Sequence, residues 1–187
     1  QKRSVKAGFK KMCRRVNGMV DWPNKIFQIL LESQDGWGDR YMTIEIKELY
    51  HPKYAEPMQQ IYKSVGWNKH TVENINLIYR ASTHVAIAFR GESIIGIGRA
   101  LSDGVFNGAI YDIVVHKDEQ GKGIAKEILT SLLNQMKSVS CIHLISTIGN
   151  EEFYKKCGFR TLKTGMARYL SDELAELYLI NGHEDRP

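Results

Sequence analysis

Six consecutive residues, Gln120-Gly121-Lys122-Gly123-Ile124-Ala125, have the composition of a loop that holds a phosphate group. Its two glycines let a ligand approach the backbone closely and tolerate positive φ angles. An apolar stripe of helical period follows, and the first N–H groups of a helix have no partner within that helix. Together with the positive end of the helix dipole, these groups attract an anion. The loop therefore predicts a diphosphate-binding site.

The spacing of the glycines excludes two common nucleotide-binding loops. In a P-loop, Ser or Thr must follow the lysine, and here Gly123 follows it. A dinucleotide-binding motif that starts at Gly121 or Gly96 needs Gly or Ala five residues later, where the chain has Lys126 and Leu101. On these residues alone, a glycine-rich turn that binds nothing stays open as an alternative.

The apolar pattern around the loop predicts an α/β (α+β) domain with one mixed sheet and helices on both faces. Gly91-Glu92 joins two of its strands as a two-residue hairpin turn. We expect strands over residues 42–49, 83–90, 93–101, 109–115 and 142–147, with two short strands inside 159–170. We expect helices over residues 54–65, 71–80, 121–137 and 151–157.

Both ends of the chain differ from this domain. We divide the 187 residues into a basic N-terminal extension (1–40), a domain (41–170) and a tail (171–187). A short helix is expected after Asn24 and a turn over 35–39, and the tail has the pattern of an amphipathic helix.

The net charge of +5 is concentrated in the first fifteen residues, where seven lysines and arginines occur and no acidic residue stands before Asp21. Such a cluster attracts phosphates, yet no aromatic residue or motif accompanies it, so we do not expect nucleic-acid binding.

Composition excludes several classes of protein. The three cysteines are odd in number and lack CxxC spacing, which argues against a disulfide framework and a zinc site. No apolar run approaches the roughly 20 residues that cross a bilayer, and the basic start lacks the apolar core of a secretory signal. We expect a soluble, cytoplasmic protein without a membrane span.

Three ordered motifs resemble those of a known enzyme family. The loop matches the Q/R-x-x-G-x-G/A signature of the GNAT superfamily of N-acetyltransferases through Gln120, Gly123 and Ala125. The segment Tyr111–His116 resembles the central strand of that family, and Glu152–Phe159 resembles its FYxKxGF helix and turn.

The resemblance covers about residues 42–170. Within the superfamily, Ser64–Trp67, Arg99–Gly104 and Thr164–Ala167 are similar to a branch of small bacterial enzymes and their plastid relatives that acetylate arylalkylamines.

The resemblance implies acetyl-CoA as the acetyl donor. Its pantetheine arm would lie where the strand ending at Val115 splays from the next strand, and would pair with backbone groups near Ile113 and Val115. Its diphosphate would lie on the glycine loop. The residues that the resemblance implies for cofactor binding are Ile113, Val114, Val115, Gln120, Gly121, Lys122, Gly123, Ile124, Ala125, Asn150 and Phe153.

The same resemblance implies direct transfer of acetyl from sulfur to an amine. The amine must first lose a proton, because a free alkylamine titrates near 10, so a base, a water relay or desolvation is required. A backbone N–H near Val114 would stabilise the oxyanion, and Tyr154 would protonate the departing thiolate. Asp112 is the candidate base, or it orients the amine. Tyr111 and Asp112 should point to opposite faces of the sheet unless a bulge intervenes.

We favour a primary amine of a small molecule as the acceptor. One alternative is an acetyltransferase of protein N-termini or lysines, to which the basic extension would dock a partner. Another is a regulatory protein that binds acetyl-CoA without turnover, although Tyr154 in its motif disfavours this reading. Residues 50–80 correspond to the segment that shapes the acceptor site in this family, and they contain no motif that identifies the substrate. Dimers are common in the family, so a homodimer is a state to test.

Overall fold

The structure, a computed structural model, describes residues 15–16, 19–20 and 43–180. The predicted helix after Asn24, the turn over 35–39 and nearly all of the basic cluster lie outside the described residues. The chain divides into two compact units, Gln1–Ile44 and Glu45–Pro187. In the first unit, β1 (Arg15–Val16) pairs antiparallel with β2 (Met19–Val20).

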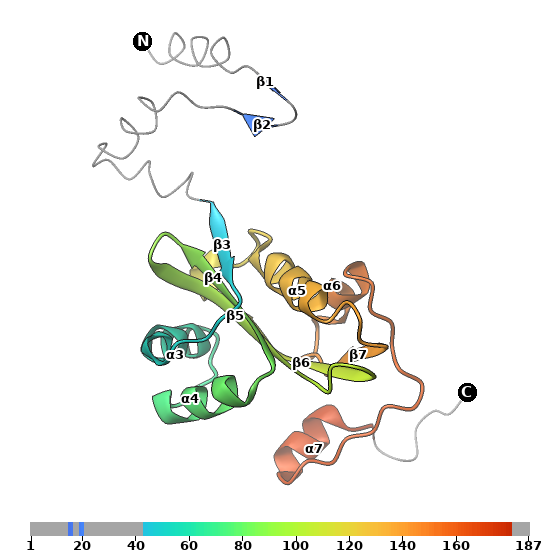
Figure 1. Ribbon diagram of the computed structural model, residues 1–187. Coiled ribbons are helices and arrows are strands. Elements are labelled where there is room, and N and C mark those ends of the chain that lie inside the picture. The colour runs from blue at the N-terminus through green and yellow to red at the C-terminus, as the bar shows by residue number, and fades with distance from the viewer. Residues whose placement is uncertain (1–14, 17–18, 21–42, 181–187) are drawn as a thin grey trace, which may run out of the picture. The chain divides into compact units, whose positions relative to one another are not determined.

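A five-stranded sheet of order β3-β4-β5-β6-β7 forms the centre of the second unit (Figure 1). The β4–β5 and β5–β6 pairs are antiparallel and the β6–β7 pair is parallel, which confirms the predicted mixed sheet. The strands are β3 (Ile44–Lys47), β4 (His84–Arg90), β5 (Ser93–Ser102), β6 (Asn107–Val115) and β7 (Cys141–Leu144).

Helices cover both faces of this sheet, with α3 and α4 on one side and α5 and α6 on the other (Figure 1). Local caps set their starts: the Thr71 hydroxyl accepts the Asn74 N–H at 3.2 Å at the start of α4. The helical segments are η2 (Pro52–Tyr54), α3 (Ala55–Ser64), α4 (Val72–Ala81), η3 (Lys117–Glu119), α5 (Ile124–Gln135), α6 (Glu151–Lys156) and α7 (Asp172–Tyr178).

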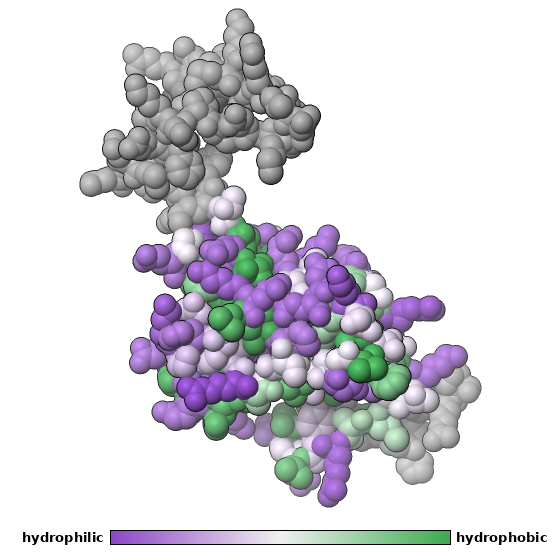
Figure 2. All heavy atoms as spheres, viewed as in Figure 1, coloured by the Kyte–Doolittle hydropathy of each residue, from purple (hydrophilic) through white to green (hydrophobic). Residues whose placement is uncertain are grey.

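The core lies on both sides of the sheet. On one side, Tyr62 of α3 and Tyr79 of α4 are fully buried against strand residues such as Ile97. On the other side, α5 packs closely because β5 carries glycine at the contact: a Cβ on Gly98 would lie 2.5 Å from a methyl carbon of Ile128. The surface visible in Figure 2 is mostly hydrophilic, and hydrophobic side chains appear there as separate patches.

One prediction about the sheet was wrong. Residues 159–170 form no strand. Strands need a partner that supplies ladder hydrogen bonds and a buried face that fixes their register. Most side chains of this segment are exposed, Met166 and Leu170 at 97% each, so no apolar face holds it against β7.

Candidate active site

The glycine loop connects η3 to the start of α5. Gly121 and Gly123 have φ angles of 76° and 84°, a region that side chains disfavour, so both glycines are needed for this path. Because of them α5 begins at Ile124 and not at Gly121 as predicted. Gly123 is the N-cap of α5 and supplies no side-chain capping bond. The first N–H groups of α5 are therefore free of a side-chain cap and suited to an anion.

Side chains fasten this loop to the end of β6 and to η3. The Gln120 side-chain N–H donates to the Val115 carbonyl at 3.2 Å. Lys122 Nζ lies 3.0 Å from a carboxylate oxygen of Glu119, and Arg90 lies 2.6 Å from that same oxygen. Burial raises the pKa of Glu119, but the hydrogen bonds from Arg90 and Lys122 outweigh burial and lower it. The Lys122 charge is thus shared with Glu119.

β6 and β7 part next to the loop. They pair only from Asn107 with Cys141 to Ile110 with Leu144, so residues 111–115 continue β6 beyond the pairing. The His116 N–H donates to Ile95 of β5, and successive peptide groups of a strand point to opposite edges. The peptide groups of Ile113 and Val115 therefore point to the edge where β7 has left. β6 and β7 therefore splay apart here, as the resemblance to the GNAT superfamily implied.

A bulge interrupts the other edge of β6. Arg99 stands opposite Tyr111 and Ile97 opposite Val114, so Asp112 and Ile113 together face one residue of β5, Gly98. Asp112 has a φ of 51° and is the one non-glycine residue with positive φ among those described. An extra residue in one strand shifts the alternation of side chains by one position.

The shift brings Tyr111 and Asp112 to the same face of the sheet, the face covered by α3 and α4. The Arg99 guanidinium lies 4.8 Å from the centre of the Tyr111 ring, and its Nε donates to Asp112 Oδ2. The Tyr62 hydroxyl donates to the same Asp112 oxygen at 3.2 Å. Tyr79 lies behind Tyr62, their hydroxyl oxygens 3.4 Å apart. Arg99, Tyr62 and Tyr79 were not predicted as site residues from the sequence. They meet at Asp112 only because of the bulge, and no sequence motif indicates where a bulge occurs.

Tyr154 lies on α6 against two aromatic rings, with its ring centre 5.0 Å from that of Phe153 and 6.0 Å from that of Phe159. Burial, and then the neighbouring Cys157 thiol, raise the pKa of Tyr154 above its ordinary value. Asn150 is the N-cap residue of α6, and its side-chain N–H donates to the Thr147 hydroxyl at 2.7 Å.

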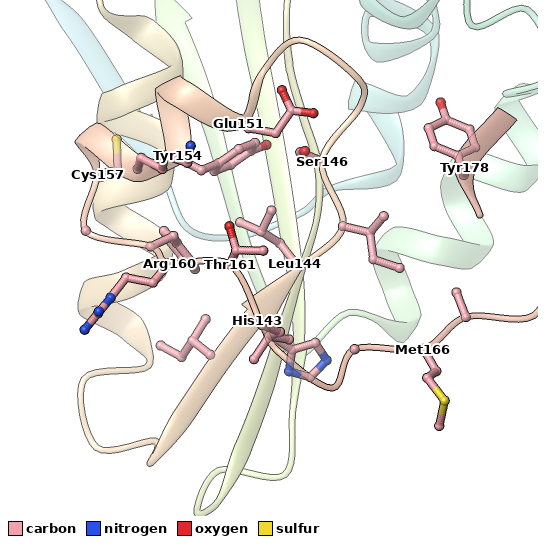
Figure 3. A pocket seen from close by; sticks show the side chains of 18 of the residues that line it. His143, Leu144, Ser146, Glu151, Tyr154, Cys157, Arg160, Thr161, Met166 and Tyr178 are labelled. Atoms are coloured by element: carbon pink, nitrogen blue, oxygen red, sulfur yellow. The ribbon is translucent and has the colours of Figure 1, made fainter. Parts of the chain in front are cut away.

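Tyr154 lines a cavity of about 1100 Å³ between β7, α6 and residues 158–180. Figure 3 shows its hydroxyl directed toward the side of the cavity where Ser146 and Glu151 lie. Residues 120–125 do not line this cavity. Within the described residues no hydrogen bond joins Tyr154 to Asp112 or to the glycine loop, so the predicted site residues form three groups: the loop with the end of β6, the bulge, and α6.

None of the helices in the described residues is both long and apolar enough to cross a membrane.

The sequence is similar to those of several known proteins. The Acetyltransferase (GNAT) family matches residues 41–159. An uncharacterized N-acetyltransferase of Pyropia yezoensis is 30% identical over 126 residues, which are 62% of this chain and 72% of the relative. Serotonin N-acetyltransferase 2, chloroplastic, of Oryza sativa subsp. japonica is 27% identical over 54% of each chain. Histone acetyltransferase TAP1 of Glycine max is 27% identical over 58% of this chain and 53% of the relative.

Solved structures show the same fold. A GNAT family acetyltransferase from Streptococcus pneumoniae TIGR4 superposes with a TM-score of 0.59 at 24% identity, over 70% of this chain and 98% of that one. The family match spans more than half of the chain and includes the loop, the bulge and α6. The chain therefore belongs to the GNAT family and is an N-acetyltransferase.

Proposed function

We propose that this chain transfers the acetyl group of acetyl-CoA directly to a primary amine of a small molecule. One observation supports this most: the glycine loop is tied to the end of β6 at Val115, where β6 has parted from β7. An anion site at the start of α5 therefore follows, along the chain, the segment of β6 that β7 does not pair with. A ligand with a diphosphate at one end and an amide-bearing arm at the other matches that order.

In this proposal the backbone N–H groups of residues 123–125 hold the diphosphate. The pantetheine amides pair with the peptide groups of Ile113 and Val115, as a strand would. Val114 stands opposite Ile97 of β5 and is buried, so its own side chain contributes to the core. The acetyl oxygen receives its hydrogen bond from a backbone N–H of this same segment.

Tyr154 is the proposed general acid. The amine nitrogen attacks the thioester carbonyl, the carbon–sulfur bond breaks, and the phenol gives its proton to the departing thiolate. Burial raises the pKa of Tyr154, so the phenol carries its proton at neutral pH and has one to give. The amine loses its own proton to a water or base before it attacks.

The acceptor class rests on the relatives. The relative named for serotonin acetylation supports a small arylalkylamine, whereas the relative named as a histone acetyltransferase supports a protein lysine as the second candidate. Thiol release from acetyl-CoA should be measured with tryptamine-type amines, amino sugars and lysine-containing peptides in parallel. We expect kcat/KM for one class of small amine to exceed that for every peptide. Turnover of peptides alone would overturn the proposed acceptor but not the acetyltransferase.

A further inference from the structure

The bulge of β6 places a carboxylate in a closed set of contacts. Asp112 Oδ2 accepts from Arg99 Nε and from the Tyr62 hydroxyl. The side chains of Arg99 and Asp112 are 14% and 13% exposed, and Tyr62 is fully buried. One carboxylate oxygen is therefore fixed by two partners from two different elements, β5 and α3.

The hydroxyl chain behind Asp112 leads into the core. Tyr62 has one hydroxyl proton and donates it to Asp112, so Tyr79 must be the donor in the contact between the two phenols. Tyr79 is 1% exposed, which closes the chain to solvent. Burial raises the pKa of Tyr62 and of Tyr79, so both phenols keep their protons. The two hydroxyl groups of Tyr62 and Tyr79 therefore cannot carry away to solvent a proton that Asp112 would take from an amine.

We infer that Asp112 is a positioning residue that clamps the bulge of β6, and that Arg99 and Tyr62 are the two sides of the clamp. The inference rests on the proposed function, because the clamped segment is the one that would receive acetyl-CoA.

The clamp determines which peptide groups face the gap between β6 and β7. The bulge is what sets Ile113 and Val115, and not Val114, toward that gap, because an extra residue shifts the alternation of the strand. Asp112 holds a left-handed conformation that an L residue adopts at a cost, and its side-chain contacts offset that cost. Without the bulge the Asp112 side chain would turn to the opposite face, where Ile128 of α5 packs against β5. The ion pair therefore requires the bulge and in turn stabilises it.

Substitutions at position 112 distinguish a clamp from a base. Glycine adopts a φ of 51° without strain and asparagine tolerates it, whereas alanine does not. If Asp112 clamps the bulge, kcat of Asp112→Gly and of Asp112→Asn should be at least about 10-fold higher than kcat of Asp112→Ala. A factor of this size corresponds to the free energy of backbone strain that alanine introduces at this position. Arg99→Met should lower kcat about as much as Asp112→Ala, although it leaves the carboxylate in place.

Amide hydrogen exchange at residues 113–115 gives a readout independent of turnover. We expect faster exchange there in Asp112→Ala and Arg99→Met than in the wild type, and unchanged exchange in the control Lys47→Met, whose exposed ion pair with Glu45 lies on β3.

Two results would overturn the clamp. The first is that the Gly, Asn and Ala variants at position 112 are equally inactive while Arg99→Met stays active. The second is that amide exchange at residues 113–115 in Asp112→Ala and Arg99→Met is as slow as in the wild type. If the wild-type protein released no thiol with any amine, the proposed function would be refuted. The clamp would still stand or fall on the amide exchange measurement, which does not depend on turnover.

Discussion

Arg99 and Asp112 form an ion pair on the face of the sheet covered by α3 and α4, although strict alternation along β6 would place Asp112 on the other face. A one-residue bulge makes the pair possible. Tyr111, the neighbour of Asp112 in sequence, lies on the same face, beneath the Arg99 guanidinium. Three side chains that alternation would separate therefore form one cluster on β6, the strand that borders the gap between β6 and β7.

Removal of Arg99 should destabilise the fold. Arg99→Met leaves the Asp112 carboxylate nearly buried with only the Tyr62 hydroxyl as a partner, and breaking a buried pair costs about 3–5 kcal/mol. We expect the free energy of unfolding in urea to fall toward that range. Lys47→Met, which breaks a pair with side chains 39% and 64% exposed, should change it by less than about 1 kcal/mol. If the two variants changed the free energy of unfolding equally, the Arg99–Asp112 pair would contribute no more to stability than an exposed ion pair.

Substitution of Gly123 should weaken acetyl-CoA binding. A Cβ at Gly123 would have no protein atom within 4 Å, so Gly123→Val creates no clash within the protein. The valine would instead strain the backbone at its φ of 84° and block the approach of a ligand to the loop. We expect a loss of affinity of at least about 10-fold by calorimetry. Gly104→Val is the matched control, since Gly104 has a φ of 79°, also has open space around it, and lies in the turn at the opposite end of β6. If both variants bound acetyl-CoA equally well, the loop would not be the diphosphate site.

Tyr154→Phe should lower kcat by about 100-fold and leave the affinity for acetyl-CoA nearly unchanged, because the phenol would act only in the transition state. Tyr169→Phe provides the control within the same cavity, where the Tyr169 ring stacks on that of Tyr178 at 5.6 Å. Steady-state kinetics and calorimetry on both variants decide the matter. Full activity of Tyr154→Phe would remove Tyr154 from the mechanism.

The pH dependence of kcat also tests whether Tyr154 is the general acid. Burial raises the pKa of Tyr154 above its ordinary value of 10.0, so the phenol keeps its proton through neutral pH and loses it only above pH 10. We expect kcat of the wild type to begin to fall only above pH 10, and the residual activity of Tyr154→Phe to show no such fall. Circular dichroism at each pH controls for unfolding. An alkaline decline centred below pH 10 that persists in Tyr154→Phe would arise from another group.

Asp103 stabilises the turn between β5 and β6. Its carboxylate accepts backbone N–H groups of Val105, Phe106 and Asn107 at 2.8–3.0 Å. The bonds from Asn107 and Val105, the largest contributions, lower the pKa of Asp103 to about 2. A lowered pKa means that this stabilisation is full above the ordinary value of 3.8 and disappears as the pH falls through about 2.

We therefore expect Asp103→Ala to unfold at a lower temperature than the wild type at pH 6, with the difference shrinking between pH 4 and pH 2. A difference independent of pH would mean that the carboxylate charge has no part in the turn.

Much of the fold is readable from local patterns. The helices expected over residues 54–65, 71–80 and 121–137 correspond to α3, α4 and α5, and the hairpin expected at Gly91-Glu92 joins β4 to β5. These features depend on neighbours in sequence. Residues 159–170 have a strand-like composition but lack a partner and a buried face, and no local pattern reports either.

The site shows the same division. The glycine loop was visible because its chemistry is contained in six adjacent residues. Arg99, Tyr62 and Tyr79 were not, since they meet Asp112 only through the register of β5 and β6 and the packing of α3 and α4. Alternation predicted opposite faces for Tyr111 and Asp112 unless a bulge intervened, and nothing in the residue types indicated that one does.

Titration calorimetry with acetyl-CoA, followed by thiol-release assays on the same sample with the amine panel, tests the central claim most directly. We predict one acetyl-CoA bound per chain, binding that weakens in Gly123→Val, and thiol release that depends on one class of amine. An absence of acetyl-CoA binding by the wild-type chain would contradict the assignment of the loop and of the gap beside β6.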